Sequence, residues 1–270
     1  MTSLPRSWLF VPGTRPDRFD KAAAGAAQGL ILDLEDAVAE TEKPQARRNV
    51  LDFLARPTYP ERIVAVRINP LTCATGLEDL AALARSSDGP DHIMVPKVED
   101  PESLILAASV LRNAKSGAQL SALIESARGV ARAAEIAERT PNLSALFFGA
   151  ADYAADLGQQ VGVFQPEFAR AALVNAAAAG GVAAIDSPFF AIDRPDLLAA
   201  ECAASRRAGF YGKAAIHPNQ LAEINAAFQP TDAERALARR ILDAAIDGVG
   251  VMDGKMIDAA MVRWAERTAP

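Results

Sequence analysis

Eight short apolar runs, each followed by a stretch with helix features, constrain the fold more than anything else in this sequence. Most runs are apolar almost without a break, the pattern of parallel strands covered on both faces. Helix-start signals separate them, among them Asp100-Pro101 and Pro166-Glu167. Eight such units predict an α/β fold, the (β/α)8 TIM barrel. The runs cover residues 7–12, 29–34, 63–69, 92–97, 119–125, 144–149, 182–187 and 213–217.

The main competing architecture is an open, doubly wound α/β sheet. Its dinucleotide-binding form carries G-x-G-x-x-G after the first strand, and no such motif follows run 7–12. No linker rich in Gly, Ser or Pro divides the chain, so we expect one barrel domain over residues 1–230. The remaining segment, 231–270, should begin with a long helix after a capping box at Thr231 and Glu234. The glycine-dense stretch 247–254 then precedes a C-terminal tail.

Composition excludes several classes of protein. The net charge of −6 argues against a nucleic-acid binder. Two histidines are too few for a multi-histidine zinc site, and Cys73 and Cys202 fit neither a disulfide scaffold nor a thiolate metal cage. We expect both cysteines to pack as small apolar groups. No stretch approaches the roughly 20 apolar residues of a membrane helix, and no secretory signal is visible, so we expect a cytoplasmic protein without a membrane partner.

Charged and polar side chains gather at the ends of the runs, where a barrel carries its active site. Carboxylates crowded at one mouth need a cation, and oxygen ligands favour the hard ions Mg2+ or Mn2+. Glu125 and Asp152, at the ends of adjacent runs, are the best-placed pair for such an ion. The residues at the mouth include Asp33, Glu35, Asp36, Arg67, Asn69, Lys97, Glu125, Asp152, Asp186 and His217.

Most of these residues also have a purely structural interpretation. Glu125 could stabilise the start of a helix, and Asp152 could cap the following turn. Lys97 could simply pair with a neighbouring acid, and His217 could be a structural histidine. Arg67 is the exception, because a guanidinium inside the apolar run 63–69 needs a partner. A functional role is therefore favoured for Arg67.

Seven motifs in order along the chain carry a family resemblance. They are RSWLFVPGTRP at 6–16, GLILDLEDAV at 29–38, VRIN at 66–69, VPKVE at 95–99, LIESA at 123–127, FGAAD at 148–152, and GK at 212–213 with IHPNQ at 216–220. The set resembles the citrate lyase β-subunit-like (CitE-like) proteins. These belong to the wider group of malyl-CoA lyases, citramalyl-CoA lyases and HpcH/HpaI aldolases. One motif would be a weak signal, but seven in order are specific.

The resemblance implies a reaction and a set of central residues. Members of this group are Mg2+-dependent carbon–carbon lyases. They cleave or form short 3-hydroxyacyl thioesters such as malyl-CoA or citramalyl-CoA by a reversible Claisen-type reaction that yields a 2-oxo acid. Glu125 and Asp152 fall on the metal ligands, and through the metal Glu125 also contributes to substrate binding. Arg67 falls on the arginine that binds the substrate carboxylate or carbonyl.

The resemblance also assigns residues at the edge of this centre. Lys21 matches a position that contacts the CoA portion, and Phe10 lies near the same contact. The segment around His217 lines the site in relatives. Asp36 or Glu35 could hold metal-bound water, and the sequence does not choose between them.

The C-terminal tail carries a further motif, GKMID at 254–258. Some relatives have a similar segment that reaches over the active site of a neighbouring subunit and supplies a catalytic aspartate. The resemblance therefore makes Asp258 a candidate acid/base, residues 231–270 a lid, and the protein a homotrimer or a hexamer. The structural alternative is that Asp258 caps the helix that follows it.

Two other functions fit the same residues. A thioesterase acting on a malyl-CoA-type substrate needs almost the same site, and would release malate and free CoA. True citrate lyase β-subunits act on thioesters of an acyl carrier protein, within a complex of several chains. Analysis of the products distinguishes these functions from a lyase that acts on CoA thioesters by itself.

Overall fold

The computed structural model describes residues 4–56, 62–160, 166–246 and 249–269. Contacts within the chain divide it into two compact units, Met1–Phe228 and Gln229–Pro270. Each unit has its own secondary structure and its own apolar core.

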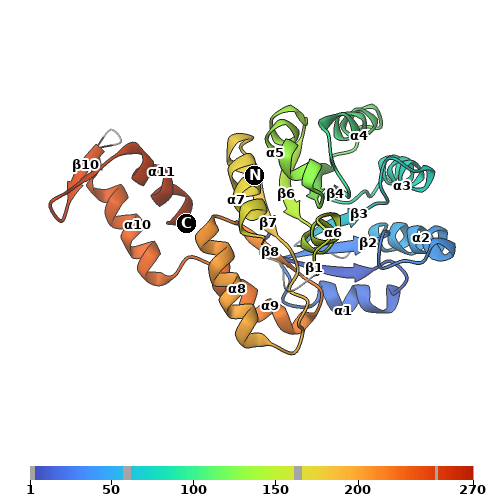
Figure 1. Ribbon diagram of the computed structural model, residues 1–270, viewed down its shortest axis with the longest axis horizontal. Helices are drawn as coiled ribbons and strands as arrows, with labels where there is room; N and C mark the ends of the chain where they lie inside the picture. The colour runs from blue at the N-terminus through green and yellow to red at the C-terminus, as the bar shows by residue number, and fades with distance from the viewer. Residues whose placement is uncertain (1–3, 57–61, 161–165, 247–248, 270) are drawn as a thin grey trace. The chain divides into compact units, whose positions relative to one another are not determined.

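Eight parallel strands close into a barrel in the first unit (Figure 1). They follow chain order around the barrel, and β1 pairs with both β2 and β8. The predicted (β/α)8 barrel is confirmed, and every strand begins within one residue of its predicted run. The strands are β1 (Ser7–Pro12), β2 (Gly29–Asp33), β3 (Ile63–Arg67), β4 (His92–Val95), β5 (Gln119–Ile124), β6 (Leu143–Phe148), β7 (Ala183–Asp186) and β8 (Gly212–Ala215).

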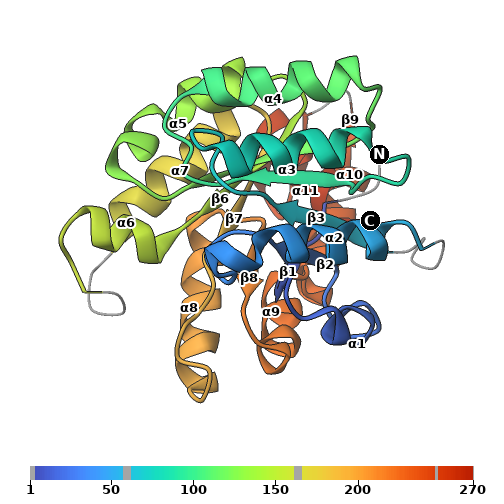
Figure 2. The ribbon, with the colours of Figure 1, turned by 90° about the vertical axis from the view of Figure 1, so that its right-hand side faces the viewer.

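Helices surround these strands, and Figure 2 shows α3 and α4 lying over them. Their starts follow local sequence signals. The Asp100 side chain accepts a hydrogen bond from the main-chain N–H of Ser103 and caps α4, which has proline in its first turn. The helices of this unit are α1 (Phe19–Ala23), α2 (Lys43–Leu54), α3 (Ala74–Arg85), α4 (Pro101–Asn113), α5 (Ala127–Arg139), α6 (Ala150–Asp156), α7 (Glu167–Ala179), α8 (Pro195–Ala208) and α9 (Leu221–Phe228).

Helix α6 differs from the expectation. The sequence predicts one helix after β6, starting near Pro166, and the structure has two, because α6 begins directly after Gly149. Asp152 therefore lies in the first turn of a helix instead of in a loop. A carboxylate there is favoured by the exposed N–H groups of the helix end.

The interior of the barrel is filled with side chains. Trp8 is fully buried in an inner cluster and makes edge-to-face contacts with His92 and Phe147, at ring-centre distances of 5.7 and 5.5 Å. A second, larger apolar layer lies between the strands and the helices and contains Cys202, as expected. Cys73 is exposed, so its predicted burial is wrong. It precedes α3 in the loop after β3, where no apolar layer covers it.

The second unit consists of two helices and a small sheet. Helices α10 (Asp232–Ala244) and α11 (Ala259–Thr268) flank β9 (Ala245–Ile246), β10 (Val249–Met252) and β11 (Lys255–Ile257), which pair antiparallel. The predicted capping box of Thr231 and Glu234 opens α10. The buried core of the second unit consists of Ala238, Ile241, Ile257 and Ala265. Within the described residues of both units, every helix is too short or too polar to cross a bilayer.

Candidate active site at the carboxyl ends of the strands

A cavity of about 390 Å³ opens where the barrel strands end. It brings together residues from six strands and from the start of α6, and combines an apolar floor with four carboxylates and one guanidinium. The lining residues include Phe10, Pro12, Asp33, Asp36, Arg67, Leu123, Glu125, Phe147, Gly149, Asp152, Phe190 and Ala214. A larger hollow, about 1200 Å³, lies at the opposite end of the barrel, where strands β3, β4, β5 and β7 begin. It contains none of the predicted site residues.

Arg67 ends β3 and has the partner that its burial requires. The register of β2 and β3 places it opposite Asp33, which accepts hydrogen bonds from Nε at 2.7 Å and from Nη2 at 2.6 Å. Its guanidinium also lies 4.9 Å from the centre of the Phe10 ring. Burial alone would lower the pKa of Arg67, but Asp33 and the nearby Glu35 and Asp36 raise it. Arg67 therefore keeps a fixed positive charge at the cavity wall.

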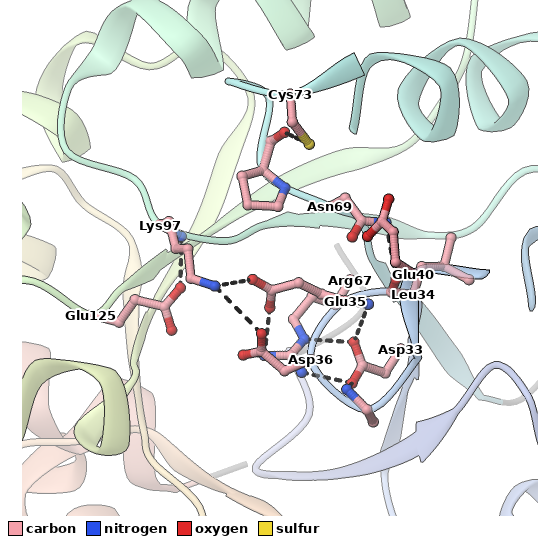
Figure 3. Close-up of polar contacts among 12 residues, drawn as sticks. Asp33, Leu34, Glu35, Asp36, Glu40, Arg67, Asn69, Cys73, Lys97 and Glu125 are labelled. Atoms are coloured by element: carbon pink, nitrogen blue, oxygen red, sulfur yellow. Dashed lines mark hydrogen bonds and ion pairs between the residues drawn. The ribbon is translucent and has the colours of Figure 1, made fainter. Parts of the chain in front are cut away.

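Glu35 and Asp36 follow β2 and differ in their surroundings (Figure 3). Glu35 is buried, and its Oε1 accepts a hydrogen bond from Nζ of Lys97 at 2.7 Å. Its Oε2 lies 3.0 Å from Nη1 of Arg67, an ion pair without the alignment of a hydrogen bond. Burial raises the pKa of Glu35. Asp36 is half-exposed and lines the cavity. Of these two carboxylates, Asp36 is therefore the one that a substrate can reach.

Glu125 follows β5 and is almost completely buried. Its Oε1 accepts a hydrogen bond from the main-chain N–H of Lys97 at 2.7 Å. Ser126 caps α5 through the N–H of Gly129, so the carboxylate of Glu125 is not needed for the helix start. Burial and the negative charges of Glu35 and Asp152 raise the pKa of Glu125 to about 8. An added cation would stabilise its charged form.

Asp152 lines the same cavity from α6 and is half-buried. Within the described parts of the chain, it makes no hydrogen bond or ion pair. Gly149 keeps the space beside Glu125 open, since a Cβ there would lie 2.6 Å from Glu125 Oε2. No group of three or more His, Cys, Asp or Glu side chains among the described residues could hold a metal. Two carboxylates with open positions fit Mg2+, which usually takes its other ligands from water and substrate.

The remaining predicted residues are spread more widely. Phe10 lines the cavity, whereas Lys21 is exposed on α1. His217 is partly buried, and its Nδ1 accepts a hydrogen bond from the N–H of Asn219 and caps a short 3-10 helix. Neither Lys21 nor His217 is among the residues around the cavity. Asp258 belongs to the second unit and caps α11 through the N–H groups of Ala260 and Met261.

Asn69 and Asp186 point into buried networks instead of the cavity. The Asn69 amide donates hydrogen bonds to Asp79 and to the main-chain oxygen of Leu34. Asp186 accepts hydrogen bonds from Lys213, Arg170 and Ser205. Burial alone would raise the pKa of Asp186, but the charges of Lys213 and Arg170 hold it below its usual range.

These two networks brace the ends of β3 and β7. Gly149 and the backbone of Lys97 contribute to the site and were not singled out from the sequence. Their only sequence signal is their place inside the motifs FGAAD and VPKVE.

Comparison with known proteins shows the family of the chain. The family model described as HpcH/HpaI aldolase/citrate lyase matches residues 6–218. An L-malyl-CoA/beta-methylmalyl-CoA lyase from Rhodobacter capsulatus is 36% identical over 97% of this chain and 93% of the relative. A (3S)-malyl-CoA thioesterase from Cereibacter sphaeroides is also 36% identical, over 97% of this chain and 93% of its own.

A solved structure extends the likeness to the whole chain. The crystal structure of the protein CitE from Mycobacterium tuberculosis, in complex with magnesium, acetoacetate and coenzyme A, superposes with a TM-score of 0.80. The two chains are 34% identical, and the match covers 100% of this chain and 99% of the other. The chain belongs to the HpcH/HpaI aldolase/citrate lyase family.

Proposed function

We propose that this protein is a Mg2+-dependent carbon–carbon lyase for short 3-hydroxyacyl-CoA thioesters such as malyl-CoA or citramalyl-CoA. One observation carries the proposal: Arg67, Glu125 and Asp152 converge on one cavity at the strand ends. The raised pKa of Glu125 indicates a site that gains from a bound cation. Relatives named for cleavage of malyl-CoA, and a neighbour solved with magnesium and coenzyme A, support this assignment.

Glu125 and Asp152 are our proposed metal ligands. Mg2+, or Mn2+ in its place, held by these two carboxylates would act as a Lewis acid and would stabilise negative charge on a substrate oxygen. Arg67 would add a fixed positive charge at the cavity wall, and its effect would be strengthened because Arg67 itself is buried from water. Asp33 keeps Arg67 in place through the two-point ion pair.

Asp36 is our candidate for the group that accepts the substrate hydroxyl proton. Of the four carboxylates around the cavity, Glu125 and Asp152 are assigned to the metal. Both oxygens of Asp33 accept hydrogen bonds from Arg67, which leaves Asp36. After the proton moves to Asp36, the carbon–carbon bond breaks. The products are a 2-oxo acid and the enolate of the shortened thioester.

Asp258 of a neighbouring subunit would protonate that enolate, with residues 231–270 acting as a lid. The second unit has a surface suited to a partner: Val251 and Met256 are register neighbours on β10 and β11, and are 70% and 71% exposed. A homotrimer, or a hexamer built from two trimers, would cover such surfaces. Lys21, with Phe10 nearby, is our candidate for contacts to the CoA portion, and His217 is our candidate for a further substrate contact at the edge of the site.

Two alternative activities follow from the named relatives. The thioesterase relative supports hydrolysis of a malyl-CoA-type substrate in the same site. The other alternative is the activity of a citrate lyase β-subunit on an acyl carrier protein thioester within a complex, and it rests on the likeness to a protein named as a citrate lyase β-subunit.

A panel of CoA thioesters distinguishes these activities. Purified protein is incubated with malyl-, β-methylmalyl-, citramalyl- and citryl-CoA, and in parallel with a citryl thioester of acyl carrier protein, each with Mg2+ or with EDTA. Oxo acid is measured as its phenylhydrazone, and free thiol is measured separately. A lyase forms oxo acid and acyl-CoA without free thiol, and only with Mg2+. Free thiol with malate or citramalate identifies the thioesterase, and cleavage only of acyl carrier protein thioesters identifies the complex subunit.

Two substitutions test the metal ligands. Glu125→Gln and Asp152→Asn should each abolish the reaction. If either variant stayed active without Mg2+, the metal assignment would be refuted.

A further inference from the structure

Lys97 has an uncommon backbone conformation beside the proposed metal site. It follows β4 and Pro96 and has φ of 52°, in the left-handed region that favours glycine. Four non-glycine residues among the described parts of the chain have positive φ, and Lys97 is the one that contacts the cavity carboxylates. Residues held in such conformations cluster at functional sites, where the surrounding structure maintains them.

This conformation aims the main-chain N–H of Lys97 at Glu125. The N–H donates to Glu125 Oε1 at 2.7 Å. Gly149 borders the other oxygen of the same carboxylate, so that Glu125 is held between the backbone of Lys97 and the backbone of Gly149. If φ of Lys97 became negative, the adjoining peptide planes would have to rotate to compensate, and one of these planes carries the N–H that donates to Oε1.

The side chain of Lys97 anchors the strained backbone on the opposite side (Figure 3). Nζ donates a hydrogen bond to Glu35 Oε1 at 2.7 Å and lies 3.4 Å from Asp36 Oδ1. Glu35 is buried and held by Arg67, so the anchor is fixed even though the Lys97 side chain is 43% exposed. One residue thus links two sets of carboxylates, through its side chain to Glu35 and Asp36 and through its backbone to Glu125.

We propose that Lys97 is a positioning residue for the metal ligand Glu125: the ion pair with Glu35 holds the left-handed backbone, and that backbone orients the Glu125 carboxylate. This inference rests on the proposed function, because it takes Glu125 to be a ligand. The ammonium of Lys97 acts here as an anchor, and its N–H is the group that touches Glu125.

Two substitutions at Lys97 distinguish the effect of the backbone conformation from the effect of losing the positive charge. Lys97→Met removes the anchor but keeps a Cβ, so the backbone should relax. Lys97→Gly removes the same charge, but glycine adopts positive φ without steric cost. Mn2+ binding to the full-length protein is measured by electron paramagnetic resonance, together with kcat and KM. We expect Lys97→Met to weaken Mn2+ binding about tenfold or more, the usual effect of losing a group that orients a ligand. Lys97→Gly should keep an Mn2+ affinity close to that of wild type.

Lys115 provides the matched control. It is an exposed lysine with φ of 59° at the end of α4, remote from the strand-end cavity. Lys115→Gly and Lys115→Met measure the same backbone effect on thermal stability, and both should bind Mn2+ like wild type. Equal Mn2+ affinity of Lys97→Gly and Lys97→Met would overturn the proposal, because the backbone conformation would then make no difference to metal binding beyond the loss of charge that both variants share. Wild-type protein that binds no Mn2+ would instead refute the proposed function.

Discussion

Asp33 and Arg67 are register neighbours on β2 and β3 and join through two nearly equal hydrogen bonds, 2.7 and 2.6 Å long. The strand pairing itself therefore places the guanidinium. Because both residues are buried, the pair works as a rigid unit in the cavity wall.

Asp33→Asn should lower both stability and turnover. The substitution removes the charge and leaves one oxygen as acceptor, so we expect a loss of about 1.5–3 kcal/mol in the free energy of unfolding. Arg67 should then be less well placed, which lowers kcat. Denaturant unfolding and steady-state kinetics measure the two effects. Asp17→Asn is the control, because Asp17 forms the same two-point pair with Arg15 on the surface. Equal effects at both sites would contradict the prediction.

Gly149→Ala should damage the metal site while the backbone stays allowed. The new Cβ would lie 2.4 Å from the Cβ of Glu125 and 2.6 Å from its Oε2, so the carboxylate must move. We expect Mn2+ affinity to fall about 10–100-fold. Gly117→Ala adds the same methyl group where nothing lies within 4 Å, and should bind Mn2+ normally. If Gly149→Ala bound Mn2+ as tightly as wild type, metal binding would not depend on the present position of the Glu125 carboxylate.

Metal binding should depend on pH through Glu125, whose pKa is raised to about 8. A metal ligand must be ionised, so Mg2+ affinity should rise between pH 6 and 9, and binding near pH 7 should release close to one proton. Calorimetry in two buffers with different ionisation enthalpies measures that proton. Binding without proton release at pH 7 would mean that Glu125 is already charged.

The raised pKa of Glu125 also predicts that the folded protein without metal becomes less stable as the pH rises. The pKa of Glu125 is higher in the folded than in the unfolded chain, so the folded state binds the proton of Glu125 more tightly. The resulting contribution to the free energy of unfolding is fully present below about pH 4.5 and is lost as the pH rises through 8. Without divalent ions, Glu125→Gln should therefore be more stable than wild type at pH 9, by about 2–4 kcal/mol. Added Mg2+ should reverse this order. Melting temperatures with EDTA and with Mg2+ test both statements.

Asp258→Asn separates catalysis from helix capping. Asparagine caps helices about as well as aspartate, so α11 should stay intact. If Asp258 is the proton donor, turnover should fall at least about 100-fold while Mn2+ affinity stays unchanged. Asp258→Ala removes the cap as well and should also lower the melting temperature. A wild-type rate for Asp258→Asn would leave Asp258 with its capping role alone.

The barrel and its strands were predictable because each strand is an apolar run of its own. The α6 helix was not, since seven residues, Ala150–Asp156, are too few to show a helical period. Asp152 was therefore found as a candidate ligand but was placed in a loop. The sequence could not show the backbone of Lys97 either, because lysine has no preference for positive φ. That conformation comes from tertiary contacts to Glu35 and Glu125.

Trp8 separates the two hollows of the barrel. Its buried ring contacts Phe147, which borders the strand-end cavity, and His92, which borders the hollow at the opposite end. Because these packed rings fill the interior of the barrel, a substrate that binds in the strand-end cavity would enter and its products would leave through the same opening. If the acyl-CoA occupied that opening, a small oxo acid bound deeper in the cavity would have to enter before it and leave after it.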